Sequence, residues 1–349
     1  MAQEQALRIA IVGATGAVGT IMRRLAHERL GGHELVAFAS DRSAGRQLDD
    51  GLVCQPLRDD TVAGFDLALF SAGGSTSRAW APRFADQGAV VIDNSSAFRM
   101  EPDVPLVVSE VNPEAIDDSP RGIVANPNCT TMVAMLPAKA LHDLYGMTEM
   151  VATSFQAAGG AGQKGIDELT GQIATVGADI DQLVSDGAAA AAKVTHSVHA
   201  ATLAFNVVPL LGTLDDDGYT DEEMKLQNES RKILGIPGLR VTPTCVRVPV
   251  VVGHAIAIRA TFEREPDMDE ALAALAAFPN LVVDDLPTPL EWAGRNETVV
   301  GRVRRDLADR NAINFFVVGD NLLKGAALNT VQLAELAIAR GRVGAGAAA

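Results

Sequence analysis

One of the three cysteines, Cys129, lies in a sequence context that is typical of a nucleophile. Cys129 follows Asn128 and precedes an apolar run of helical character from Met132 to Leu144. Its thiol is therefore expected at or near a helix N-terminus, where the helix dipole and free backbone N–H groups lower a thiol pKa and can hold an oxyanion. Free cysteines are more often buried filler, and we interpret Cys54 and Cys245 in that way. For Cys129 the context predicts a reactive thiolate.

A nucleophilic thiol needs a proton partner, and His254 is the best candidate among the six histidines. It follows Gly253 in an apolar, strand-like segment, seven residues after Arg247. Alone, a histidine in a strand indicates a core residue and Arg247 indicates a surface ion pair. Together with Cys129 they indicate a thiol–imidazole pair beside a guanidinium that could bind an anion.

A glycine-rich turn predicts a second site. The apolar strand Arg8–Val12 runs directly into a segment that opens a helix with Ile21 and Leu25 at helical spacing. Such a turn lets a dinucleotide pyrophosphate approach the backbone and the helix N–H groups, although a tight strand-to-helix turn without a ligand is the alternative. The residues expected to bind the cofactor here are Gly13, Thr15, Gly16, Ala17, Val18 and Gly19.

The residues after the next strand bear on which dinucleotide is bound. The chain reads Ser40-Asp41-Arg42-Ser43 there. Arg42 and Ser43 would suit the ribose 2′-phosphate of NADP, whereas Asp41 could accept a hydrogen bond from the 2′-hydroxyl of NAD. We favour NADP.

The surrounding elements predict an α/β fold. Continuous apolar strands at Leu35–Ala39, Leu67–Phe70 and Val90–Asp93 alternate with helical segments. This pattern is typical of a parallel sheet covered on both faces, here a Rossmann-like doubly wound N-terminal domain. From Met147 the pattern changes to that of a second, α+β domain, and Asn321–Arg340 predicts a C-terminal helix that returns to the first domain. We expect the boundaries 1–128 plus 321–349, and 129–320.

Composition limits the possible partners. The 349 residues exceed twice the scale of a domain of about 150 residues. A formal charge of −15 argues against nucleic acid as a partner. The longest uncharged apolar stretch, Val248–Ile258, is too short for the roughly 20 residues of a membrane helix. Three scattered cysteines predict neither disulfides nor a zinc cluster, and with no secretory leader apparent we expect a reducing, cytoplasmic location.

The motifs taken together resemble the aspartate-β-semialdehyde dehydrogenase family over nearly the whole chain. Each motif alone is weak, but their order and spacing are specific. They are Gly13–Gly19, Asp93–Arg99, Asn126–Thr131, Gln156 after an apolar strand, Glu222–Lys225, Cys245–Pro249 followed by Gly253-His254, and Gly319–Leu322.

This resemblance implies reduction of 4-phospho-L-aspartate (aspartyl phosphate) by NADPH to aspartate semialdehyde and phosphate. It also implies that the second, α+β domain is the catalytic and dimerisation domain of a homodimer or a dimer of dimers. It makes Cys129 the nucleophile that forms a thioacyl-enzyme, His254 the general acid/base, and Gln156 the residue that orients the acyl group. The remaining implied roles are Arg247 for the substrate α-carboxylate, Glu222 for its ammonium, Arg99 and Lys225 for the phosphoryl group, Asn128 in the substrate site, and Arg42, Ser43, Gly159, Gly160 and Asn321 for the cofactor.

Two alternatives remain at this stage. N-acetyl-γ-glutamyl-phosphate reductase uses similar chemistry, but an N-acetylated substrate has no ammonium for Glu222 to pair with. A catalytically silent NADP-sensing regulator would keep only the glycine-rich turn. The chain also departs from the family pattern at Gly159, where a serine is common, so a hydroxyl contact to the cofactor is expected to be missing.

Overall fold

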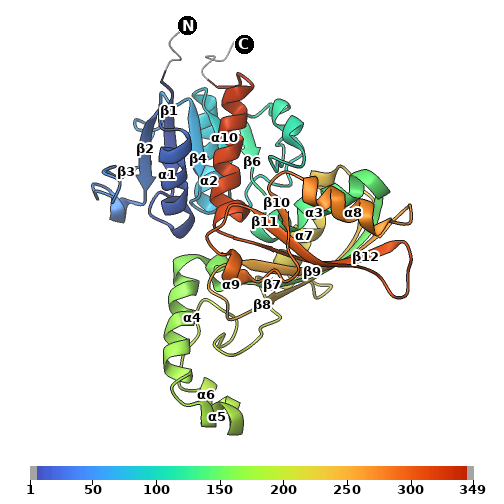
Figure 1. The fold of residues 1–349 in the computed structure, drawn as a ribbon. Helices are drawn as coiled ribbons and strands as arrows, with labels where there is room; N and C mark the ends of the chain where they lie inside the picture. The colour runs from blue at the N-terminus through green and yellow to red at the C-terminus, as the bar shows by residue number, and fades with distance from the viewer. Residues whose placement is uncertain (1–5, 344–349) are drawn as a thin grey trace. The chain divides into compact units, whose positions relative to one another are not determined.

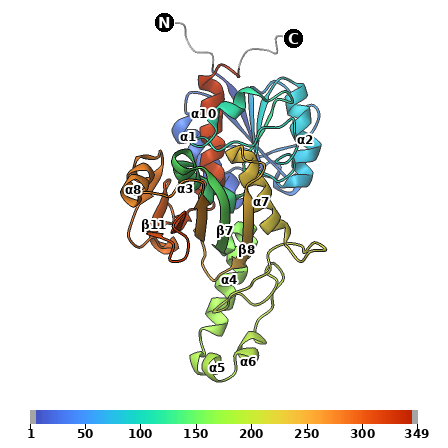
Figure 2. The same ribbon diagram turned by 90° about the vertical axis from the view of Figure 1, so that its right-hand side faces the viewer.

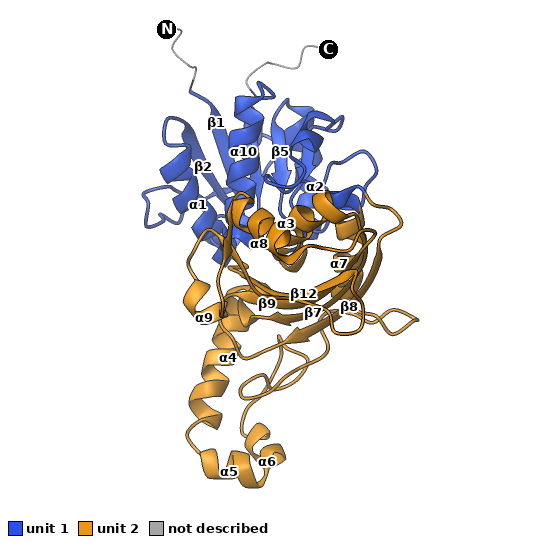
Figure 3. Cartoon of the chain, turned by 45° about the vertical axis from the view of Figure 1, so that its right-hand side comes forward, with its two compact units in different colours: residues 1–128, 232–235, 323–349 blue, residues 129–231, 236–322 orange. Residues whose placement is uncertain are grey.

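The computed structural model describes residues 6–343, which divide into two compact units. Among the described residues, unit 1 comprises 6–128, 232–235 and 323–343, and unit 2 comprises 129–231 and 236–322 (Figure 3). No helix among the described residues is long and apolar enough to cross a membrane.

Unit 1 is built on a six-stranded parallel sheet in the order β3-β2-β1-β4-β5-β6 (Figure 1). This is the strand order of a Rossmann fold, so the predicted fold class is confirmed. The strands are β1 (Arg8–Val12), β2 (Glu34–Ala39), β3 (Gln55–Pro56), β4 (Leu67–Phe70), β5 (Val90–Asp93) and β6 (Ile123–Ala125). The helical elements are α1 (Ala17–Arg29), η1 (Asp41–Ser43), α2 (Gly74–Asp86), η2 (Pro113–Asp117), the π-helix η4 (Leu323–Leu328) and α10 (Asn329–Ala339).

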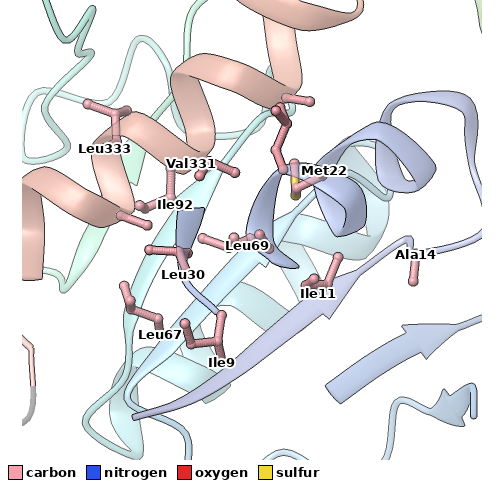
Figure 4. Close-up of a cluster of buried hydrophobic side chains, with 14 of the residues drawn as sticks. Ile9, Ile11, Ala14, Met22, Leu30, Leu67, Leu69, Ile92, Val331 and Leu333 are labelled. Carbon is pink, nitrogen blue, oxygen red and sulfur yellow. The ribbon is translucent and has the colours of Figure 1, made fainter. Parts of the chain in front are cut away.

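Both faces of this sheet are covered, which explains why its strands are apolar throughout. On one face, Ile11 and Leu69 from the central strands meet Met22 of α1 and Val331 of α10 in a fully buried cluster (Figure 4). On the other face, Phe84 of α2 packs edge-on against the aromatic rings of neighbouring strands. The C-terminal helix thus completes the core of unit 1, as the sequence predicts.

The start of this C-terminal helix differs from the prediction of a single helix from Asn321. The Asp320 carboxylate accepts a hydrogen bond from the Leu322 N–H at 2.8 Å, a local arrangement that competes with helical hydrogen bonding. A π-helical segment then precedes α10, and within it the buried Lys324 ammonium reaches Glu110 and Gln332. Asn321 therefore lies in a turn before the helix.

Gly13 explains the geometry of the turn after β1. Its φ is +88°, and a Cβ at this position would lie 2.3 Å from the Ser71 carbonyl oxygen at the end of β4. Only glycine fits both restrictions. The turn delivers the chain to Gly16, the N-cap of α1, which makes no side-chain capping bond. The first backbone N–H groups of α1 consequently have no intrahelical acceptor.

Unit 2 contains a mixed six-stranded sheet in the order β10-β11-β12-β9-β7-β8. Its strands are β7 (Met147–Gln156), β8 (Arg240–Arg247), β9 (His254–Phe262), β10 (Leu281–Val283), β11 (Thr298–Arg305) and β12 (Ala312–Gly319). Its helices are α3 (Cys129–Tyr145), η3 (Ala158–Ala161), α4 (Gly162–Val176), α5 (Ile180–Ser185), α6 (Gly187–Ala191), α7 (Asp221–Leu234), α8 (Met268–Ala277) and α9 (Pro289–Trp292). From the sheet, α4 leads away to the short α5 and α6 (Figure 2).

The apolar run from Val246 to Ile258 is not one strand. It forms the end of β8 and the start of β9, with residues 248–253 between them. Pro249 cannot donate to a strand ladder, and Gly253 adopts a φ of +101°, so the run breaks there. The break places Arg247 and His254 at strand ends, where side chains can reach a site.

Candidate active site

The ends of three neighbouring strands lie side by side on one side of the unit 2 sheet, and we call this place the site edge. Gln156 ends β7 and is paired in register with Arg247, which ends the parallel strand β8. On the other side of β7, His254 begins the antiparallel strand β9, whose next residue pairs with Phe155. An antiparallel strand begins where its neighbour ends, so these three predicted residues come together although they are far apart in the sequence.

Cys129 faces His254 at this edge. It is the first residue of α3, and its Sγ lies 3.2 Å from His254 Nε2. The thiol is partly exposed, whereas His254 is fully buried. A sulfur at a helix N-terminus beside an imidazole is an arrangement suited to nucleophilic catalysis. Cys54 and Cys245 are buried, and burial raises the pKa of each thiol, to about 12 for Cys245.

The peptide groups of Ala157 hold two of the side chains. The Ala157 N–H donates to His254 Nδ1 at 3.0 Å, and its carbonyl oxygen accepts a hydrogen bond from Arg247 Nη1 at 2.7 Å. Ala157 is fully buried directly after Gln156. Sequence reasoning missed this residue, because the contacts use the backbone and leave no signal in the side-chain type.

Burial dominates the electrostatics of the basic groups. Burial lowers the pKa of His254 well below its usual value, and the nearby Arg247 cation lowers it further. Burial also lowers the pKa of Arg247, although Glu222 and Cys129 act in the opposite direction. Burial therefore disfavours the charged form of both groups.

The start of α7 brings acidic and basic groups to the same edge. Gln156 Nε2 donates to Glu222 Oε1 at 3.3 Å, and Lys225 Nζ donates to Glu222 Oε2 at 3.2 Å and to Asp221 at 2.6 Å. Burial lowers the pKa of Lys225, but these two carboxylates outweigh it and raise the pKa overall. Glu222 and Lys225, three residues apart on α7, thus form an ion pair.

A capping box fixes where α7 begins. The Thr220 N–H donates to the Glu223 carboxylate at 2.8 Å, and the Glu223 N–H donates to the Thr220 hydroxyl at 3.2 Å. The same carboxylate accepts from the Cys245 N–H at 2.9 Å, which ties the helix start to β8. The Thr-Asp-Glu-Glu sequence carries the signal for this cap, which sequence reasoning overlooked.

Asn321 and the glycines after Gln156 form another group in unit 2. Asn321 Oδ1 accepts a hydrogen bond from the Gly253 N–H at 2.9 Å, whereas the buried Asn321 Nδ2 has no partner. A Cβ on Gly159 would lie 3.5 Å from this nitrogen. A buried donor without an acceptor is costly, and an amide oxygen of a ligand would satisfy it. The arrangement fits the carboxamide of a nicotinamide ring.

A cavity of about 580 Å³ lies in unit 1 at the carboxyl ends of β1, β2 and β4. This crevice is where Rossmann folds bind dinucleotides. Of the predicted cofactor residues, Gly13, Thr15 and Gly16 line it. Asp41 also lines it, whereas Arg42 and Ser43, on η1, are not part of its lining among the described residues.

Arg99 and Asn128 belong to unit 1. Arg99 is buried, which excludes the simple surface position that its sequence alone would suggest. Its Nε donates to the Asn126 carbonyl oxygen at 2.9 Å and its Nη2 to the Asn94 carbonyl oxygen at 3.0 Å. These bonds hold the guanidinium in one orientation. Asn128 is buried immediately before Cys129 in the chain.

Comparison with known proteins shows which family the chain is similar to. Residues 8–119 match the family model described as semialdehyde dehydrogenase, NAD binding domain, and residues 138–324 match semialdehyde dehydrogenase, dimerisation domain. The chain is 52% identical to an aspartate-semialdehyde dehydrogenase of Streptomyces akiyoshiensis over 95% of this chain and 99% of that protein. Identity to the Corynebacterium glutamicum enzyme is 48%, with coverage of 95% and 99%. A crystal structure of aspartate semialdehyde dehydrogenase II from Vibrio cholerae, complexed with ASA, has a TM-score of 0.88 and 39% identity over 96% of this chain and 99% of that one.

Proposed function

The chain belongs to the aspartate-semialdehyde dehydrogenase family, and from this premise we propose that it reduces 4-phospho-L-aspartate to aspartate semialdehyde with release of phosphate, using NADPH. The observation that carries the proposal is the 3.2 Å approach of Cys129 Sγ to His254 Nε2 at the N-terminus of α3. Arg247 and Glu222 stand beside this pair in the same unit.

The charged groups match the two ends of an amino acid. We propose that Arg247 takes the substrate α-carboxylate as a planar fork and that Glu222 takes the α-ammonium. Ala157 already orients Arg247 through Nη1, so the guanidinium loses little freedom on binding. Gln156 orients the acyl group, Asn128 contributes to the substrate site, and Arg99 and Lys225 bind the phosphoryl group.

In the proposed reaction the Cys129 thiolate holds the acyl group of the substrate as a covalent thioester. Cys129 attacks the acyl carbon of the substrate, and phosphate departs from the tetrahedral adduct to leave a thioester. A thioester accepts hydride more readily than a carboxylate does. Collapse of the resulting thiohemiacetal releases the aldehyde and regenerates the thiolate. The resemblance implies that His254 serves the tetrahedral oxygen as general acid/base.

We propose NADP as the cofactor. When bound, it supplies the hydride that reduces the thioester to the level of the aldehyde. In unit 1, the turn from Gly13 to Gly19, together with Arg42 and Ser43, would hold its phosphates. In unit 2, Gly159, Gly160 and the unpartnered Nδ2 of Asn321 would hold its nicotinamide carboxamide. Asp41 at the cavity wall is the residue that would favour NAD instead.

Glu222 weighs against the alternative reductase. Its carboxylate lies next to Gln156 and Lys225 at the site edge, where a free ammonium would pair with it. N-acetyl-γ-glutamyl phosphate offers only a neutral amide there. We also propose a homodimer, consistent with the dimerisation-domain match, and a cytoplasmic location suited to three free cysteines.

One assay tests these assignments together. Formation of NADPH is followed with aspartate semialdehyde plus phosphate, beside parallel reactions with N-acetylglutamate semialdehyde and with NAD. We expect phosphate-dependent turnover with aspartate semialdehyde and NADP. Turnover of the N-acetylated substrate alone would assign the other reductase, and NADPH binding without any turnover would indicate the silent regulator.

A further inference from the structure

Arg23 is a buried charged residue that the proposed chemistry does not use. It lies on α1 in unit 1, and only 4% of its surface is exposed. A charged group that is withdrawn from water must find partners within the protein, because an unpaired charge there is costly. The contacts of this guanidinium therefore indicate which parts of unit 1 it holds together.

The Arg23 guanidinium bridges two loops of unit 1. Its Nε donates a hydrogen bond to the Ala14 carbonyl oxygen at 3.0 Å, in the glycine-rich turn after β1. Its Nη2 donates to Asp49 at 2.9 Å, and its Nη1 forms an ion pair with Asp50. All three nitrogens of the planar fork are thus used, one on the turn and two on the segment that follows β2.

The two carboxylates lie at the tip of a hairpin formed by residues 45–54, which we call the 45–54 hairpin. At its base the Gly45 N–H donates a hydrogen bond to the Cys54 carbonyl oxygen at 2.9 Å. After Cys54 the chain enters β3, the two-residue strand at the edge of the unit 1 sheet. The base of the hairpin is therefore attached to the sheet, and Arg23 attaches its tip to α1.

The 45–54 hairpin continues directly from η1, which carries Arg42 and Ser43. The Arg46 N–H donates to the Ser43 carbonyl oxygen at 3.1 Å, so the last residue of η1 is bonded to the start of the hairpin. η1 has only three residues, and a helical turn of that length is not stable by itself. Its position is therefore set by β2 before it and by the hairpin after it.

The glycine-rich turn has attachments that do not depend on Arg23. The N–H groups of Gly13 and Ala14 both donate to the Phe38 carbonyl oxygen of β2, at 2.9 and 3.0 Å. The close approach of Gly13 to the Ser71 carbonyl oxygen adds a second constraint. Loss of the Arg23 guanidinium would therefore release the tip of the hairpin far more than the turn.

We propose that Arg23 is a positioning residue for cofactor selection: by holding the tip of the 45–54 hairpin, it keeps η1 in place for the ribose 2′-phosphate of NADP. The inference rests on the proposed use of NADP. Each mobile side chain that must be ordered on binding costs about 2- to 10-fold in affinity, and this cost falls when the side chain is already in position. The effect is confined to NADP, because NAD has no 2′-phosphate for Arg42 and Ser43 to bind.

Equilibrium binding tests the proposal in Arg23→Met, which keeps a long side chain and removes its donors. The dissociation constants of NADP, NAD and 2′,5′-ADP are measured by calorimetry on the full-length enzyme. We expect NADP and 2′,5′-ADP to bind about tenfold more weakly than to the wild type, and NAD to bind within about twofold of it. The matched control is Arg24→Met, because this neighbour is exposed and pairs with Glu28 along α1. All three constants should keep their wild-type values in the control.

An unchanged ratio of the NADP and NAD dissociation constants in Arg23→Met, whether both stay or both rise, would overturn the proposal. Asp50→Asn tests the same attachment in a variant that keeps the bond from Arg23 to Ala14, so a folding defect of Arg23→Met would leave this second test intact. We expect NADP to bind about threefold more weakly to Asp50→Asn, with NAD binding unchanged. Wild-type affinity for both dinucleotides would contradict the proposed attachment.

Hydrogen exchange locates the effect without any cofactor. We expect the amides of residues 41–54 to exchange faster in Arg23→Met than in the wild type, and those of residues 8–19 to keep their rates. Equal exchange of residues 41–54 in both proteins would show that Arg23 does not hold the hairpin. A wild-type enzyme that binds NAD as tightly as NADP would refute the proposed cofactor, and with it the role in selection, whereas exchange would still decide whether Arg23 holds the hairpin.

Discussion

Gly160 stands where a side chain would enter the site of unit 2. Its backbone does not have the positive φ that disfavours other residues, so an alanine is compatible with the local conformation. A Cβ there would lie 2.9 Å from Arg247 Nη1 and 3.2–3.3 Å from two atoms of the His254 ring. The methyl group of Gly160→Ala would therefore press on two proposed site residues at once.

The size of the effect follows from these distances. Ordinary carbon contacts are about 3.5–4.0 Å, so Arg247 Nη1 must retreat by roughly 0.6–1 Å. Its 2.7 Å hydrogen bond to the Ala157 carbonyl oxygen would then be stretched or broken. A misplacement of about 1 Å can cost roughly 100-fold in rate, which corresponds to about 2.7 kcal/mol of transition-state stabilisation. Folding should suffer less, because the end of an arginine side chain can move.

Two quantities are measured for each variant: kcat/KM for aspartate semialdehyde and the midpoint of thermal unfolding. The matched control is Gly171→Ala, at an exposed position inside α4 where a Cβ meets nothing within 4 Å. We expect Gly160→Ala to lose about 100-fold in kcat/KM with a small change in the midpoint. Gly171→Ala should keep full activity and gain about 0.5–1 kcal/mol of stability.

Two results would refute the reasoning. Wild-type kcat/KM in Gly160→Ala would mean that Arg247 and His254 do not need their observed positions. Loss of activity that merely tracks a large fall in the unfolding midpoint would mean that the residue serves the fold.

Three further predictions concern single residues. Cys129→Ala should abolish turnover while NADP binding stays near normal, and activity within tenfold of wild type would remove the covalent mechanism. Arg247→Lys should raise the KM for aspartate semialdehyde through loss of the planar fork, so an unchanged KM would contradict its role. Glu168 is partly buried, which would raise its pKa, but the N–H groups of Val198, His199 and Ser197 and the Ser197 hydroxyl outweigh burial and lower the pKa to about 2. Because the folded pKa lies below the usual value of 4.5, Glu168→Gln should lower the free energy of unfolding by about 1–2 kcal/mol at neutral pH, after allowance for solvent screening. This loss of stability should vanish as the pH falls from about 4.5 toward 2. A loss that did not depend on pH in denaturant unfolding would disprove the account.

The Rossmann unit was predictable because its signals are local. Apolar strands such as Leu67–Phe70 are buried on both faces, and the glycine-rich turn after Val12 reflects steric limits within a few residues. The helix N-terminus at Cys129 is also a local feature, set by the change from Asn128 to an apolar helical run. Patterns of this kind follow from backbone and burial preferences that a single sequence records.

The assembly of unit 2 was less predictable because it depends on pairing between distant segments. Nothing near Gln156 indicates that it lies in register with Arg247, since that pairing results from the packing of β7 beside β8. Residues 248–253, which separate Arg247 from His254, are apolar like the strand that follows them, so composition alone does not mark the break. The resemblance to a family supplied the grouping that residue patterns alone left open.

The net charge of −15 raises the question of how this chain could bind an anionic substrate. At long range the field of the protein repels acyl phosphates, so attraction must be produced over a few ångströms. In the proposed site Arg247 would meet this requirement, because its guanidinium is partly desolvated and the Ala157 carbonyl oxygen holds it in place. Repulsion at a distance combined with a preorganised cation at the site favours ligands that also satisfy Glu222. An acidic protein can in this way select a zwitterionic amino acid derivative over simple anions.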